Sequence, residues 1–220
     1  MLGRILAPMI LLATLPSSAL AGSGKLETIG EFTDPKASDA LRSTLDPKGH
    51  RVILGDGNVL CEIWWRNGVP TQPKQDLPGT AYTEIAVSTL LGVVFFPKAS
   101  ADYRGQTIKP GAYTLRYELL PNDGNHLGAA PNRDFLLLIP VDADKDPNAR
   151  LKFEEMVNLS RKTSATNHPS PLSLIPAGNQ KDFPALIEND HGHLVLLSKV
   201  KTAAGTDLSL ALMVKGQAEQ

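Results

Sequence analysis

Residues 110–119 read Pro-Gly-Ala-Tyr-Thr-Leu-Arg-Tyr-Glu-Leu. The Pro-Gly pair predicts a turn, because proline fixes φ and glycine permits positive φ. Side chains then alternate with period two, which is typical of a strand with one buried and one polar face. The apolar face carries Tyr113, Leu115, Tyr117 and Leu119, and the polar face carries Thr114, Arg116 and Glu118. The sequence therefore predicts a half-buried strand that begins at this turn.

Similar strand patterns recur along the chain. Arg51–Leu54 and Val59–Trp65 flank the turn residues Gly-Asp-Gly-Asn, which predicts a hairpin. Further strands are expected over 82–96 (one long strand or a pair), 134–141, which is apolar on both sides, and 172–175. Strands over 191–197 and 207–214 are expected to form a second hairpin around Gly205-Thr206. Because no regular strand-helix-strand alternation is present, we expect a mainly β fold, an antiparallel β-sandwich or jelly roll.

One helix is expected to be inserted into this β fold, at about 147–163. Asp146 suits the N-cap and Pro147 the first helical position, and apolar residues from Leu151 to Val157 follow helical spacing. A second, short helix is expected near residues 38–45, capped by Ser38 or by the preceding Asp-Pro pair.

A resemblance supports the β interpretation. The stretch Ile108-Lys-Pro-Gly-Ala-Tyr-Thr-Leu115, followed by Asp134-Phe-Leu-Leu137, resembles the turn-and-strand signature of a group of uncharacterised secreted bacterial β-sandwich proteins. The Pro-Gly-x-Tyr-Thr-Leu core is also similar to one in transthyretin-like and carboxypeptidase-regulatory-type sandwiches. The resemblance implies an exported, β-rich bacterial protein, and it carries no catalytic residue over to this chain.

The first residues of the chain are predicted to be a signal peptide. Arg4 precedes an apolar run, and Ala19-Leu20-Ala21 offers small residues at a cleavage site, so residues 1–21 are expected to be removed. Of the 220 residues, removal of 21 leaves 199, which suits a single domain over 22–220. No remaining apolar stretch is long enough to span a bilayer, so we expect a periplasmic or secreted protein.

The charge and the cysteine content argue against a nucleic-acid-binding protein and against a fold held by internal disulfides. Without Arg4, 21 basic residues face 23 acidic ones, a net charge of −2 with no basic field for nucleic acid. The single cysteine, Cys61, has no partner for an internal disulfide and lies on an apolar strand face, where a thiol is usually inert.

Four residues are candidates for a ligand site at a loop-lined end of the sheets. Alternation puts Trp64 and Trp65 on opposite faces, so Trp64 is a candidate to stack on a sugar, although the more common outcome is that both rings are core. Arg116 lies on the polar face of its strand, and Asp123 and His126 lie in the loop after it. Glu62 and Glu118 are expected to form ion pairs with Arg66 and Arg116.

Three histidines are candidate metal ligands. His191 and His193 are two residues apart, so on a strand they share a face, and His168 lies in a loop that is able to close over them. Imidazoles favour zinc or copper over calcium. The acidic run Asp142-x-Asp144-x-Asp146 fails as a calcium loop, because proline and Phe153 occupy decisive positions, and helix capping explains it better.

Three functions remain open from the sequence. The preferred one is a non-enzymatic module that binds a carbohydrate or another envelope component and needs no cofactor. The alternatives are a small metal-dependent hydrolase or oxidoreductase that uses the histidines, and a structural protein of the envelope.

Overall fold

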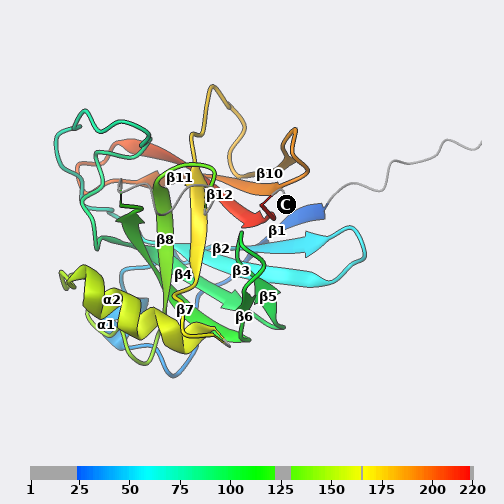
Figure 1. The fold of residues 1–220 in the computed structure, drawn as a ribbon, viewed down its shortest axis with the longest axis horizontal. Helices are drawn as coiled ribbons and strands as arrows, with labels where there is room; N and C mark the ends of the chain where they lie inside the picture. Colours follow the sequence, from blue (N-terminus) through cyan, green and yellow to red (C-terminus); the bar gives the residue numbers. More distant parts are fainter. Residues whose placement is uncertain (1–23, 122–129, 165, 219–220) are drawn as a thin grey trace, which may run out of the picture.

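In the computed structural model of the chain, residues 24–121, 130–164 and 166–218 are described. Over these residues ten strands form one antiparallel sheet (Figure 1). The predicted signal peptide and two of the proposed ligand-binding residues, Asp123 and His126, lie outside the described residues. No helix among the described residues has the length and apolar character needed to cross a membrane.

The first seven strands across the sheet lie in the order in which they occur along the chain, and the last three lie in reverse order. In spatial order the strands are β1 (Gly24–Ile29), β2 (Gly49–Leu54), β3 (Val59–Trp65), β4 (Leu90–Phe96), β7 (Gly111–Leu119), β8 (Asp134–Pro140), β9 (Pro171–Ile175), β12 (Asp207–Lys215), β11 (Leu194–Lys201) and β10 (Ala185–Glu188). The sheet rolls up until its two edge strands, β1 and β10, touch. A separate small ribbon pairs β5 (Ser100–Ala101) with β6 (Thr107–Ile108).

The inner face of the rolled sheet is filled by apolar side chains from nearly all of its strands. Ile63, Leu115, Leu136, Leu196 and Leu210 are among the fully buried members of this core. Burying one such side chain stabilises a fold by about 1.5–3 kcal/mol. The interior of the described sheet is therefore filled by side chains, and the candidate ligand sites lie at its surface.

The two hairpins predicted from local patterns are confirmed. β2 pairs with β3 across a turn in which Gly57 has a φ of 82°, and β11 pairs with β12 across a turn that contains Gly205. β8 is buried on both faces, as its continuous apolar run predicted. The long strand or pair of strands predicted over 82–96 is wrong in its first half, because only Leu90–Phe96 is a strand and residues 82–89 contain turns.

The predicted helix at 147–163 is shorter than expected. It begins at Phe153, as α2 (Phe153–Ser160), and continues into the 3-10 turn η1 (Arg161–Thr163). The carbonyls of Asp146 and Pro147, which would start a helix at 147, accept hydrogen bonds from Arg116 and Arg66 instead. The short helix predicted near Ser38 is confirmed as α1 (Asp39–Arg42), with the Ser38 hydroxyl accepting from the Leu41 amide.

The outer face of the sheet is covered as well. Segments around α1 cover β3 and β4, α2 packs on β8, and the stretch before β10 covers β11 and β12. The outer face of β7, predicted to be polar and exposed, is buried from Ala112 to Glu118. The reason is tertiary, because the segment from Asp144 to Ala149 lies on it and binds the Arg116 side chain.

Candidate functional site

A groove lies on the outer face of β2, β3 and β4. A row of directly opposed residues crosses these strands: Glu27 faces Arg51, Arg51 faces Glu62, and Glu62 faces Phe95. Such opposed side chains lie about 4.5–5.5 Å apart at Cβ, so the row forms one continuous floor. The predicted partner of Glu62 was Arg66, and this is wrong, because Arg66 donates to the Pro147 carbonyl and to Asn148.

Charges on this floor are paired. The Nε and Nη2 atoms of Arg51 both lie 2.7 Å from Glu62 Oε1, and Nη1 lies 4.0 Å from Glu27 Oε2. A hydrogen bond from Lys25, with the charges of Lys25 and Arg51, holds the pKa of the Glu27 carboxyl below its ordinary value. The floor thus presents both carboxylate acceptors and guanidinium donors to a ligand.

The wall of the groove is the extended segment that follows β1. Residues 29–36 run beside the row and enclose a cavity of about 610 Å³, lined also by Trp64 and Phe95, which we call the strand groove. Phe32 packs on Trp64 with ring centroids 5.0 Å apart, and the Trp64 indole N–H donates to the Gly30 carbonyl at 2.8 Å. Phe95 is half-buried, whereas Trp64 is only 5% exposed.

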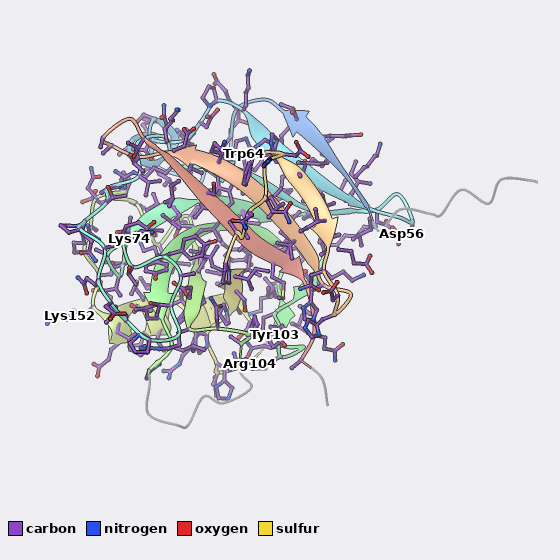
Figure 2. The ribbon with its side chains drawn as sticks, turned by 90° about the horizontal axis from the view of Figure 1, so that it is seen from above. Asp56, Trp64, Lys74, Tyr103, Arg104 and Lys152 are labelled. Atoms are coloured by element: carbon purple, nitrogen blue, oxygen red, sulfur yellow. The ribbon has the colours of Figure 1, made fainter. Side chains whose placement is uncertain are left out.

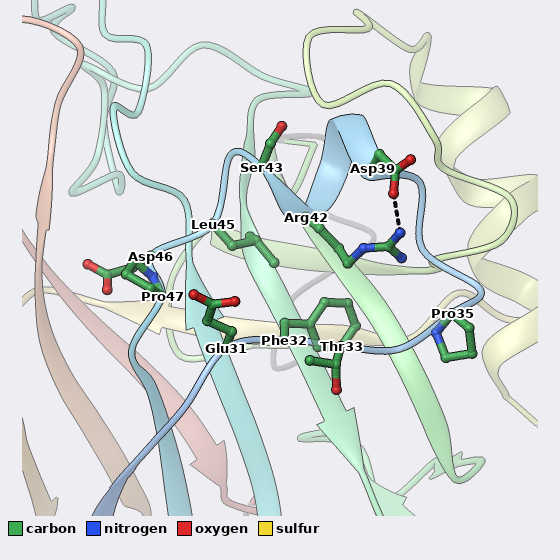
Figure 3. A pocket seen from close by; sticks show the side chains of 10 residues that line it. All are labelled: Glu31, Phe32, Thr33, Pro35, Asp39, Arg42, Ser43, Leu45, Asp46 and Pro47. Carbon is green, nitrogen blue, oxygen red and sulfur yellow. Dashed lines mark hydrogen bonds and ion pairs between the residues drawn. The ribbon is translucent and has the colours of Figure 1, made fainter.

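A second cavity continues on the other side of this segment. It has a volume of about 680 Å³, shares Glu31, Phe32, Thr33 and Pro35 with the strand groove, and we call it the helix cavity (Figure 3). Arg42 and Asp39 of α1 form an ion pair at its rim. Carboxylates outnumber cations across the two spaces, with Glu31, Asp34, Asp39, Asp46 and Glu62 against Lys36, Arg42 and Arg51.

Of the two predicted ligand-binding residues that the structure describes, Trp64 lines this site and Arg116 does not. Both tryptophans face opposite sides of the sheet, as predicted, and both rings are core. Arg116 is fully buried, and its guanidinium binds Asp144 at 2.7 Å from both Nε and Nη2 and donates to the carbonyls of Ser88, Asp146 and Ala149. The N–H groups of the guanidinium are therefore all bonded within the protein, and none is left to bind a ligand.

Glu118 also differs from expectation. It accepts a hydrogen bond from the Leu119 amide and is not paired with Arg116. Burial raises the pKa of its carboxyl. A carboxyl group with a raised pKa is a candidate acid or base. β4 separates β7, which carries it, from the groove strand β3, so Glu62 and Glu118 are not neighbours on the sheet.

The histidines are placed differently from the prediction, since His191 and His193 lie in a turn before β11 and not on a strand. Their rings nevertheless stack, with centroids 5.7 Å apart. Both line a cavity of about 330 Å³ with Tyr103, Pro131, Ile175, Asn189, Met213 and Ala218, which we call the histidine pocket. His168 lines a different, mainly apolar cavity of about 140 Å³ beside α2.

The single cysteine is unsuited to nucleophilic chemistry. Cys61 is 1% exposed in the core, and burial raises the pKa of its thiol. Among residues 24–121, 130–164 and 166–218, no three His, Cys, Asp or Glu side chains gather to hold a metal ion.

Few residues of the strand groove were predictable from the sequence. Alternation placed Glu62 and Trp64 on one face of β3, but nothing local showed that Arg51 and Phe95 align with them. Comparison of the chain with protein-family models, curated proteins and solved structures gives no match.

Proposed function

We propose that this protein is an exported, non-enzymatic module that binds a neutral oligosaccharide of the bacterial cell envelope in the strand groove. The observation that carries the proposal is the cross-strand row of Arg51, Glu62 and Phe95 under the wall formed by residues 29–36. Sugars bind where an aromatic ring packs on their apolar face and charged groups exchange hydrogen bonds with their hydroxyls.

The charge of the site favours neutral over acidic ligands. The carboxylates of the strand groove and the helix cavity outnumber the cations, so an anionic polysaccharide would be repelled. The two spaces share Glu31, Phe32, Thr33 and Pro35 and so lie next to each other along this segment, and we propose that an oligosaccharide extends from one into the other.

Binding is favoured over hydrolysis by the state of the carboxylates. Glu62 is ion-paired with Arg51, and a hydrogen bond from Lys25, with the charges of Lys25 and Arg51, lowers the pKa of the Glu27 carboxyl, whereas the proton donor of a glycosidase needs a raised pKa. We further describe the rolled sheet as a two-layered sandwich. The supporting observation is that β1–β4, β7 and β8 pack their inner faces on the strands β9–β12.

A binding experiment with matched variants tests the function. Isothermal titration calorimetry with three neutral probes, cellohexaose, chitohexaose and maltohexaose, should detect binding by the mature protein. Phe95→Ala should weaken it at least tenfold, a loss of about 1.4 kcal/mol. The control is Phe153→Ala, which removes an exposed phenylalanine on α2, 45% exposed, outside the groove.

Two results would contradict the proposal. One is no binding to any of the three probes, and the other is equal loss in Phe95→Ala and Phe153→Ala. The exported state is checked separately by N-terminal sequencing of protein recovered outside the cytoplasm, which should begin at Gly22.

A further inference from the structure

The cavity beside α2 is a second site, and we call it the α2 cavity. It has a volume of about 140 Å³, and it is lined by Phe153 and Val157, which are one turn apart on α2. Arg104, which also lines this cavity, and Trp64, which lines the strand groove, lie far apart in Figure 2. The α2 cavity is therefore distinct from the strand groove.

The body of the α2 cavity is apolar. Phe135 and Leu137 of β8 are buried and belong, with Val157, to the apolar cluster under α2. Apart from Arg104 and His168, every described residue that lines the cavity is apolar. A cavity of about 150 Å³ with an apolar lining stays free of water and accommodates a benzene molecule. The α2 cavity is therefore about the size of one aromatic ring.

The Phe153 side chain indicates which kind of apolar group fits. It is one of two large apolar side chains that are exposed among the described residues, with an exposed fraction of 45%, and it borders the apolar cavity. A ligand in the cavity would contact this ring and the ring of Phe135. Contacts between aromatic rings stabilise more than the burial of their area alone. The two phenylalanines therefore favour an aromatic ligand over an aliphatic one.

Two nitrogen-bearing side chains lie at the mouth of the cavity. Arg104 and His168 are exposed, whereas Phe135 and Leu137 are buried, so the polar end of the cavity faces the solvent. The described residues that line the cavity include no acidic side chain. The mouth therefore suits a negatively charged group, and the body suits an uncharged one.

The turn that carries Arg104 is fixed against the other side of the mouth. Buried Asp102 Oδ1 accepts hydrogen bonds from the backbone amides of Arg104 at 3.0 Å and Gln106 at 2.9 Å. The Pro169 carbonyl accepts from Gln106 Nε2 at 2.9 Å and from Arg104 Nη2 at 3.2 Å. Within the described residues the Arg104 side chain donates only through Nη2, to Asp102 at 3.3 Å and to Pro169. Its Nε and Nη1 are therefore able to donate to a ligand.

These observations together define a ligand class. We propose that the α2 cavity binds a small aromatic monocarboxylate, with its ring against Phe153, Val157 and Leu137 and its carboxylate at Arg104 and His168. Hydrogen bonds from a guanidinium to a carboxylate are among the strong ones, because both partners are charged. The volume of the cavity limits the ligand to a single ring.

A nuclear magnetic resonance titration of the isotope-labelled mature protein with 3-phenylpropionate tests this site. Saturable shifts are expected for the amides of Leu137, Phe153 and Val157, and none for those of Glu62 and Phe95 in the strand groove. 3-Phenylpropan-1-ol has the same ring without the charge and should bind at least fivefold more weakly. Hexanoate, which has the charge without the ring, should also bind more weakly than 3-phenylpropionate.

Matched variants separate the contribution of the ring from that of the carboxylate. Val157→Phe should fill the cavity and weaken binding of 3-phenylpropionate at least tenfold, whereas Leu159→Phe, on the same helix but outside the lining, should not. Arg104→Gln should abolish the preference for the acid over the alcohol, and Arg161→Gln, an exposed arginine outside the lining, should keep it. Circular dichroism confirms that each variant is folded.

The unaltered protein by itself is able to overturn the proposal. It is wrong if no saturable shift occurs at the amides of the α2 cavity, if the acid and the alcohol bind equally well, or if hexanoate binds more tightly than 3-phenylpropionate. Equal affinities of folded Val157→Phe and Leu159→Phe for 3-phenylpropionate would also contradict it.

Discussion

Replacing Asp144 with alanine removes the carboxylate that neutralises the buried guanidinium of Arg116. We expect this substitution to lower the free energy of unfolding strongly. Arg116 is 0% exposed and Asp144 is 4% exposed. Removing one partner of such a buried pair costs about 3–5 kcal/mol, because the remaining charge stays in a medium that solvates it poorly. For a protein of this size the melting temperature should fall by roughly 6–20 °C.

The structure further predicts that removing both charges does not restore stability. In the double variant Arg116→Met with Asp144→Leu, no charge is left unpaired, and for an isolated pair this exchange is often neutral. Arg116 also donates to the carbonyls of Ser88, Asp146 and Ala149. Each buried acceptor that loses its donor costs about 1–3 kcal/mol, so the double variant should remain less stable than the wild type.

Chemical denaturation monitored by tryptophan fluorescence measures these free energies of unfolding. Asp207→Ala is the matched control, because it breaks an ion pair with Lys201 in which the side chains are 44% and 61% exposed. Exposed pairs contribute about 0–1 kcal/mol. The reasoning is refuted if Asp144→Ala costs no more than Asp207→Ala, or if the double variant equals the wild type.

Three further perturbations test other parts of the fold. Gly92→Ala should lower the free energy of unfolding by about 1–3 kcal/mol, because its Cβ would lie 2.3 Å from the Trp64 backbone oxygen. Gly30→Ala, with no atom within 4 Å, should change it far less, and denaturation curves compare the two. Burial lowers the pKa of His50 from 6.5, so the unfolded state takes up the proton first and stability should fall as pH drops through 6.5. His50→Gln should flatten that part of the profile, and an unchanged pH dependence would contradict this account. The Cys61 thiol is buried and burial raises its pKa, so it should react with a thiol reagent only after denaturation. Rapid reaction of the native protein would contradict the burial of Cys61.

The hairpins and the buried central strand were predictable from the sequence because their causes are local. The turn residues between β2 and β3 and the alternation along β12 act within a few positions of the chain. The continuous apolar run of β8 likewise indicated cover on both faces before any partner was known.

The start of the helix was not predictable in the same way. Asp146 and Pro147 form a good local helix start, yet Arg116 and Arg66 take their carbonyls, and the Leu151 amide donates to the Ser88 hydroxyl. Partners from β7, from the end of β3 and from the turn before β4 outcompete the local preference. A helix signal therefore fails where distant side chains bind the backbone more strongly.

The candidate sites show the same division. The sequence by itself determined that Trp64 and Trp65 take opposite faces and that His191 and His193 lie close together, because both follow from spacing of one or two residues. Only the tertiary structure decided that Arg116 is buried under the segment 144–149, that Phe95 joins Arg51 and Glu62, and that Arg104 and His168 line one cavity. The physical reason is that strand register and chain crossings set these contacts, and no periodicity along the chain records which segments will meet.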